Sequence, residues 1–291
     1  MGNSALAFIR VIVNTIYKIP FNSTKTSKFL KGECDIMQVQ GFAMKSLIVA
    51  VAAVVLCAVF VCGAGMYAQA FAKNRLVPIY CVDRTDKVCA ISFDAAWGAD
   101  KTRSIMDVCD KYGVKATFFL VGFWVDKYPE MTAEIQSRGF EIGTHSDTHP
   151  HMSKLSADEI AKELSASSRK IFDITGAPVT LFRPPFGDYN NTLLTVCGEQ
   201  GLMAVQWSVD SLDWKGLSAG EIAARVQRAD SGDIILCHNN SDHIVEALPL
   251  IFEAMRLKGL SVVPVGELVY REGYYIDGTG RQKLLVQTQT Q

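Results

Sequence analysis

From Val88 onward, short apolar segments alternate in a regular order with segments of helical pattern. The seven apolar segments read "VCAISF", "KATFFLVG", "FEIGTHS", "VTLFRPPF", "MAVQWSVD", "DIILCH" and "SVVPVGEL", with six helices predicted between them. Most of these segments are continuously apolar, which is typical of parallel strands whose sheet is covered by helices. Repetition of this kind builds either an open doubly wound sheet or a barrel. Because no GxGxxG or Walker sequence follows the first segment, there is no reason to prefer a nucleotide-binding sheet.

The helix ends support this division of the chain. The predicted helices cover 101–112, 124–138, 156–176, 192–200, 219–228 and 244–258. Ser156 can cap the third of them with Glu159 three residues later, and Gly176 can end it. Residues 271–291 are polar, and we predict a loose tail there.

Residues 46–72 contain no charged residue, and a helix needs about 20 apolar residues to cross a bilayer. We therefore predict a transmembrane anchor at 46–72. Lysines outnumber acids in residues 1–45, which predicts a cytoplasmic leader and places the rest of the chain outside the membrane. The small residues of "AQA" at 68–70 resemble a cleavage site, so a cleaved and released form is the alternative. Met37 and Met44 are alternative start positions.

The charge balance and the cysteine spacing argue against several kinds of site. Lys and Arg number 29 against 30 Asp and Glu, so nothing suggests a nucleic-acid partner. The eight cysteines form no CxxC pair, which argues against a zinc knuckle or a redox motif. Cys81 and Cys89 flank a predicted turn, and they either form a disulfide or are small buried apolar residues.

Polar side chains follow the predicted strands at their carboxyl ends, where chemistry gathers in folds of this kind. These residues are Asp94 after the first strand, His145 and His149 after the third, Arg183 after the fourth, Asp210 and Asp213 after the fifth, and His238 at the end of the sixth. We expect all of them on one rim of the sheet.

The two histidines of "HSDTH" allow two interpretations. His145 and His149 can converge on one divalent cation if the segment turns helically, or they can be solvated residues of a polar loop. Arg183 is either a surface charge or a partner that fixes Asp94 and keeps it ionised. The presence of Asp94 and His238 on the same rim favours the metal site.

The acids of "DSLDW" also allow two interpretations. They can simply cap the end of a strand, a role that fits Asp210. Alternatively, Asp213 can orient His238, with the indole of Trp214 forming a wall on which a sugar ring can stack.

The ordered set "SFDAAWG", "HSDTH", "RPPFG", "DSLDW" and "LCH" resembles the five motifs of the NodB-homology polysaccharide deacetylases, carbohydrate esterase family 4. The form FDxxWG is similar to the sporulation-associated branch of that family. The resemblance extends from about Val88 to Leu268. It implies a distorted (β/α)7 barrel, in a domain that we place at 76–270, which removes acetyl groups from N-acetylated sugars of peptidoglycan or chitin-like polymers.

The resemblance also implies a role for each matching residue and a divalent metal, with zinc expected. It assigns Asp94 as the general base, His238 as the general acid, Arg183 as the partner of the base, Asp213 as the partner of the acid, His145 and His149 as metal ligands, the backbone N–H of Phe186 as the oxyanion donor, and Trp214 as a groove residue. We add Trp97 of the first motif as a candidate sugar-binding residue.

One position departs from the pattern of the family. The residue after the base is commonly the aspartate that binds the metal, and this chain has Ala95 there. Either another carboxylate completes the site, or water does, or no metal binds. The carboxylates close enough in sequence are Asp94, Asp100, Asp147 and Asp188. Losing even a residue that only contacts a metal ligand lowers metal affinity by about 10-fold to 100-fold. Since Ala95 replaces a ligand itself, we expect weak or conditional metal binding.

Two functions of different classes follow. The first is a membrane-anchored extracytoplasmic hydrolase that removes N-acetyl groups from a cell-wall glycan. The second is a catalytically impaired glycan-binding protein with the same fold, which Ala95 favours. A membrane assembly protein that works through residues 46–72 is a third interpretation, but it leaves the strand-end residues unexplained.

Overall fold

The computed structural model describes residues 51–60 and 75–285. The chain divides into two compact units at residues 73 and 74. In the first unit, residues 51–60 are helical and exposed. The predicted leader at 1–45 and the remainder of the predicted membrane segment at 46–72 lie outside the described residues. Within 51–60 and 75–285, no helix is long and apolar enough to cross a membrane.

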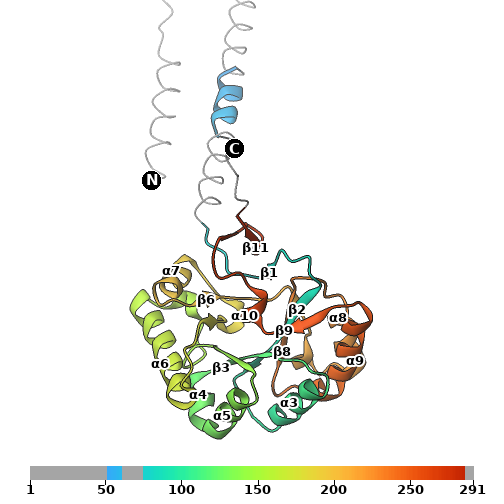
Figure 1. Cartoon of the computed structure of the whole chain (residues 1–291). Coiled ribbons are helices and arrows are strands. Elements are labelled where there is room, and N and C mark those ends of the chain that lie inside the picture. The colour runs from blue at the N-terminus through green and yellow to red at the C-terminus, as the bar shows by residue number, and fades with distance from the viewer. Residues whose placement is uncertain (1–50, 61–74, 286–291) are drawn as a thin grey trace, which may run out of the picture. The chain divides into compact units, whose positions relative to one another are not determined.

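The second unit is built on a parallel sheet with the strand order β6-β5-β4-β3-β2-β8-β7, and β9 also pairs with β2 (Figure 1). Its strands are β2 (Val88–Ala95), β3 (Thr117–Leu120), β4 (Glu141–Thr144), β5 (Leu181–Phe182), β6 (Met203–Ala204), β7 (Val209–Asp210), β8 (Ile234–His238) and β9 (Ser261–Val263). The predicted parallel α/β fold is confirmed. The sheet is a curled half-barrel with edges at β6 and β7, which is consistent with the distorted barrel that the resemblance implies.

Helices surround the sheet, as Figure 1 shows. They are α3 (Thr102–Lys111), α4 (Gly122–Lys127), α5 (Pro129–Ser137), α6 (Ala157–Thr175), α7 (Asn191–Glu199), α8 (Ala219–Val226), α9 (Ile244–Leu257) and α10 (Val265–Leu268). The predicted helix at 124–138 is two helices, because Pro129 has no N–H to continue the first and instead begins the second. The capping box of Ser156 and Glu159 and the left-handed Gly176 begin and end α6 as predicted.

The fifth predicted strand, "MAVQWSVD", is interrupted in the structure. Its first part is β6, which pairs with β5, and its last part is β7, which pairs with β8 at the opposite edge of the sheet. The intervening residues therefore pass from one edge to the other. The carbonyl of Gln206 in this crossing accepts a hydrogen bond from Nη2 of Arg183 at 3.1 Å. The crossing thus helps to fix the side chain of Arg183.

Two apolar clusters lie on the two faces of β2. Ile91, Phe93 and Ala95 belong to the cluster that includes buried residues of α3 and α9. Ala90 belongs to a second cluster with Phe119 on the inner side of the curled sheet. Because successive strand side chains point to opposite faces, Asp94 shares the inner face with Ala90. Burying a residue such as Phe93 contributes about 1.5–3 kcal/mol, so the strand is firmly held up to its last residue.

The C-terminal residues form structure where the sequence suggested a loose tail. β10 (Tyr274–Ile276) and β11 (Arg281–Leu284) form an antiparallel hairpin, and β11 pairs in parallel with β1 (Cys81–Val82). Cys81 and Cys89 are both buried free thiols, so of the two interpretations the structure has the small buried residue and not the disulfide.

Candidate active site at the carboxyl ends of the strands

A cavity of about 640 Å³ opens at the carboxyl ends of the central strands. It is lined by Asp94, Ala96, Trp97, His145, His149, Phe186, Trp207, Asp210, Trp214, Leu236, His238 and Asn240. Seven of the predicted site residues are therefore brought to one cavity, and Arg183 and Asp213 contact Asp94 and His238 from behind it. The cavity is large enough to admit a sugar ring with its substituents.

Asp94 lies at the end of β2 and is buried. Its Oδ1 accepts a hydrogen bond from Nη1 of Arg183 at 2.8 Å, and its Oδ2 lies 3.5 Å from Nε2 of His145. Burial opposes ionisation, but the positive charge of Arg183 is the largest of the attractions that outweigh it and lower the pKa of Asp94. The site therefore holds an ionised carboxylate at neutral pH.

Arg183 is completely buried, and its position explains why Asp94 stays ionised. The guanidinium carbon lies 4.1 Å from the ring centre of Phe119, which is the register partner of Asp94 on β3. Its two Nη atoms donate to Asp94 and to the carbonyl of Gln206. The predicted pairing of Arg183 with Asp94 is present in the structure.

His238 is the last residue of β8 and pairs with Asp213 of the neighbouring loop. Its Nδ1 donates to Oδ1 of Asp213 at 2.7 Å, and its backbone N–H donates to Oδ2 at 2.8 Å. Burial alone lowers the pKa of His238, but the hydrogen bond and charge of Asp213 outweigh it, so the pKa is raised. The predicted orienting carboxylate is present, and the imidazole is suited to hold a proton near neutral pH.

His145 and His149 lie on the loop after β4, with ring centres 4.9 Å apart. Nδ1 of His145 donates to the carbonyl of Arg183 at 2.7 Å, because a carbonyl can only accept. The lone pair of Nε2 therefore faces Asp94 when His145 is neutral. Burial lowers the pKa of His145, and it lowers that of His149 to about 4, so both rings are neutral bases at pH 7.

These two rings do not form a complete metal site with a third protein ligand. In the described part of the chain, no group of three or more His, Cys, Asp or Glu side chains is placed to hold a metal ion. Ala95 is completely buried among apolar residues and supplies no ligand. The donors at hand are the two imidazoles and Asp94, whose Oδ1 is already engaged by Arg183. The side chains present therefore do not fit a three-ligand zinc centre.

The other three carboxylates considered as substitutes for Ala95 do not line the cavity. Asp147 pairs with Lys170 of α6, with Nζ 2.6 Å from Oδ1. Asp188 accepts from the backbone and hydroxyl of Ser153 at 3.1 and 2.7 Å. Asp100 lies in the turn that precedes α3.

Aromatic side chains form the mouth of the cavity. Trp97, Phe186 and Trp214 are 58%, 60% and 60% exposed. Phe186 has a φ of 59° in the turn after β5, a left-handed conformation that is uncommon for a non-glycine residue. Exposed ring faces around a hollow suit stacking against a sugar.

Trp207 and Asn240 also line the cavity, and neither was predicted from the sequence. Trp207 lies in the crossing between β6 and β7, so its inward direction depends on the break in the predicted strand. Asp210 also lines the cavity, and its Oδ1 accepts from the backbone N–H of Leu212, which is the capping role considered for it.

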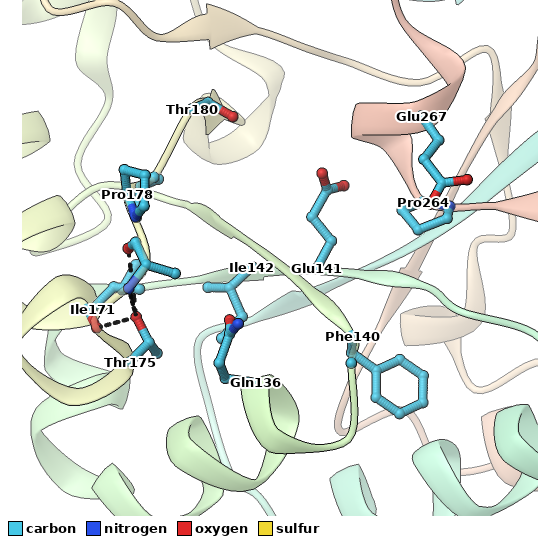
Figure 2. A pocket seen from close by; sticks show the side chains of 13 residues that line it. Gln136, Phe140, Glu141, Ile142, Ile171, Thr175, Pro178, Thr180, Pro264 and Glu267 are labelled. Atoms are coloured by element: carbon cyan, nitrogen blue, oxygen red, sulfur yellow. Dashed lines mark hydrogen bonds between the residues drawn. The ribbon is translucent and has the colours of Figure 1, made fainter.

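A second cavity, of about 320 Å³, lies at the opposite end of β4 (Figure 2). Its titratable side chains are Glu141 and Glu267, and its lining includes neither histidine nor arginine. Oε2 of Glu141 already accepts from the hydroxyl of Thr117 at 2.6 Å and from the backbone N–H of Gly266 at 2.9 Å. This cavity therefore lacks the acid and base pair that the first one has.

The first cavity brings together the kinds of group that hydrolysis requires. An ionised carboxylate can take a proton from water, and a protonated imidazole on the neighbouring strand can give a proton to a leaving group. Each of these two groups has a buried partner that favours the required charge.

Comparisons with known proteins agree with this chemistry. Residues 82–205 match the family model described as polysaccharide deacetylase. The chain is 32% identical over 186 residues to the peptidoglycan-N-acetylglucosamine deacetylase PgdA of Listeria monocytogenes, covering 64% of this chain and 39% of PgdA. It is 31% identical over 194 residues to a peptidoglycan-N-acetylglucosamine deacetylase of Bacillus cereus, covering 65% of this chain and 91% of that protein.

Among solved structures, the fold is similar to wild-type BA3943 of Bacillus anthracis, described as a CE4 family pseudoenzyme. The TM-score is 0.64 at 32% identity, covering 66% of this chain and 68% of that one. A BA3943 mutant described as having restored enzymatic activity matches with a TM-score of 0.64 at 34% identity, covering 66% of this chain and 71% of the mutant.

Proposed function

Since the chain belongs to the polysaccharide deacetylase family, we propose that it removes N-acetyl groups from a cell-wall glycan of the peptidoglycan type. The observation that carries this proposal is the placement of Asp94 and His238 beside each other on one cavity. An acid and a base that end adjacent strands can act on the two sides of a single amide bond.

The reaction needs three contributions from these residues. Asp94 takes a proton from a water molecule, whose oxygen attacks the acetyl carbon. The oxyanion that forms accepts a hydrogen bond from the backbone N–H of Phe186, at the mouth of the cavity. His238 gives its proton to the sugar nitrogen as the carbon–nitrogen bond breaks, which releases acetate and leaves a free amine.

Behind these groups, Arg183 favours the ionised form of Asp94 and Asp213 favours the protonated form of His238. Trp214 and Trp97 offer ring faces to the sugar. No step in this scheme passes through a metal, because the described residues do not supply a third ligand.

The test is acetate release from N-acetylglucosamine oligomers and from peptidoglycan by the full-length protein. We expect turnover that Asp94→Asn and His238→Ala each reduce by about 10²-fold or more. Measurable turnover that neither change affects would show that these residues do not have the roles assigned.

A second candidate function has its own support. The described residues lack a three-ligand metal group, and a structurally similar protein is described as a pseudoenzyme of the same family. We infer a catalytically impaired glycan-binding protein as the alternative. It predicts that N-acetylglucosamine oligomers bind at the cavity mouth without releasing acetate. The release assay and a binding titration on the same sample separate the two functions.

We also propose a location for the chain. The uncharged segment at 46–72 supports a single membrane anchor, with residues 76–270 on the outer side. The similarity of FDxxWG to the sporulation-associated branch of the family supports a sporulation-related role on the cell wall. Cell fractionation and protease treatment of intact cells test this arrangement. A protein found only in the cytoplasmic fraction contradicts it.

A further inference from the structure

The loop from His145 to His149, which carries both cavity imidazoles, has an unfavourable backbone conformation. Ser146 and His149 have φ values of 69° and 59°, in the left-handed region that non-glycine residues rarely adopt. Such conformations persist only where the surrounding structure fixes them. Something outside the loop must therefore hold it.

Backbone N–H groups of Gly122 and Phe123 donate to the carbonyls of Ser146 and Asp147 at 2.9 and 3.1 Å. The side-chain contact that holds the loop comes from one carboxylate on α6. Oε2 of Glu163 accepts from the backbone N–H groups of Asp147 and Thr148 at 2.9 and 2.8 Å. Oε1 of the same side chain accepts from the hydroxyl of Thr148 at 2.7 Å. Three hydrogen bonds to one ionised group are stronger than the same bonds to a neutral acceptor. Asp147 and Thr148, which Glu163 binds, lie between Ser146 and His149, the two residues with left-handed backbone.

The same face of α6 provides two further contacts. Ser167 hydrogen bonds to the hydroxyl of Thr144, and Lys170 pairs with Asp147. Positions 163, 167 and 170 are four and three residues apart, so they share one helix face. One face of helix α6 therefore contacts both the end of β4 and the loop from His145 to His149.

We propose that Glu163 is a positioning residue, which fixes this loop so that His145 and His149 point into the cavity. The inference rests on the proposed function for its catalytic consequence, but the holding of the loop can be measured without activity. Glu163 does not line the cavity and touches neither imidazole in the described structure.

The test compares full-length Glu163→Ala with a matched change on the same helix. Glu159 also accepts two hydrogen bonds with its carboxylate, from the N–H and hydroxyl of Ser156, but it does not contact the loop. Glu159→Ala therefore removes a similar group and lowers helix stability without affecting the histidines. Glu163→Gln keeps one acceptor oxygen for the two backbone N–H groups and serves as the conservative variant.

We expect Glu163→Ala to speed hydrogen exchange of the Asp147 and Thr148 amides by about 10-fold or more, because both lose their acceptor. We expect kcat for acetate release from N-acetylglucosamine oligomers to fall by about 100-fold with KM nearly unchanged. Nε2 of His145 lies 3.5 Å from Oδ2 of the base Asp94, so a moved loop displaces the base, and a displacement of about 1 Å has that effect. Glu163→Gln should restore part of both values, and Glu159→Ala should change neither.

Two results would overturn the proposal. One is unchanged exchange of the two amides in Glu163→Ala, and the other is unchanged kcat despite faster exchange. If the wild-type protein released no acetate, the proposed function would fail instead. The exchange comparison alone would then decide whether Glu163 holds the loop.

Discussion

Asp94 and His238 are register partners on the adjacent parallel strands β2 and β8. Partners in register on neighbouring strands present their side chains to the same face, about 5 Å apart. The carboxylate and the imidazole therefore reach one cavity because of strand pairing, and flexible loops are not needed to bring them together. The pairing also gives each residue a different second partner, Arg183 for Asp94 and Asp213 for His238.

The first prediction concerns the pH dependence that Asp213 imposes. The hydrogen bond and charge of Asp213 raise the pKa of His238 above its ordinary value, against the effect of burial. Asp213→Asn removes that charge, so burial then dominates and the pKa should fall. Because the acid must be protonated, the alkaline limb of kcat should move to lower pH. NMR titration of the His238 ring checks the shift even without turnover.

A control for this prediction is Asp210→Asn. Asp210 also lines the cavity, but its Oδ1 accepts from the backbone N–H of Leu212. This change should lower the His238 pKa much less than Asp213→Asn. Equal shifts in the two variants would mean that the general negative potential of the cavity, and not the specific pair, sets the pKa.

The second prediction concerns the stability of the Asp94–Arg183 pair. Arg183 is completely buried, and Asp94 is its only carboxylate partner among the described residues. Asp94→Asn leaves the guanidinium without its counter-charge. Breaking a buried pair of this kind costs about 3–5 kcal/mol. Urea unfolding should show a loss of that order, so the activity of this variant must be measured under conditions where it remains folded.

The double variant Asp94→Asn with Arg183→Gln provides the comparison. Removing both charges avoids the unpaired buried cation, so its unfolding free energy should lie closer to that of the wild type than the Asp94→Asn value does. If the double variant were less stable than the wild type by the sum of the losses of the two single variants, the two side chains would not be coupled.

The sequence allowed the site to be predicted better than the details of the sheet. The order of strands and helices places Asp94 and His238 at strand ends on one rim, and the structure has both there. The break between β6 and β7 could not be predicted, because "MAVQWSVD" is apolar on both sides of the crossing. The C-terminal hairpin did have a signal, since Asp277 and Gly278 are turn residues between two short β-forming segments.

Sequence distance was misleading for the carboxylates near the histidines. Asp147 lies between His145 and His149 in the chain, which made it a candidate third ligand. In the structure, Ser146 is left-handed and the side chain of Asp147 pairs with Lys170 on α6. The direction of a side chain in such a loop depends on contacts with a distant helix, and a local pattern does not contain that information.

The last prediction concerns Ala95, which follows Asp94 at the end of β2 and is completely buried. Ala95 lies on the face of β2 opposite to Asp94, so the carboxylate of Ala95→Asp reaches the space between Asp94, His145 and His149 only if the end of β2 turns inward. If its oxygen reaches that space, three anionic or imidazole ligands become available and zinc affinity should rise by about 100-fold. Equilibrium dialysis measures this directly, and Ala95→Asn is the control of equal size that lacks the charge. Because Ala95 also packs in the apolar cluster of β2, the alternative result is a lower unfolding temperature with no gain in zinc affinity. That result would contradict the view that this alanine is what keeps the metal site incomplete.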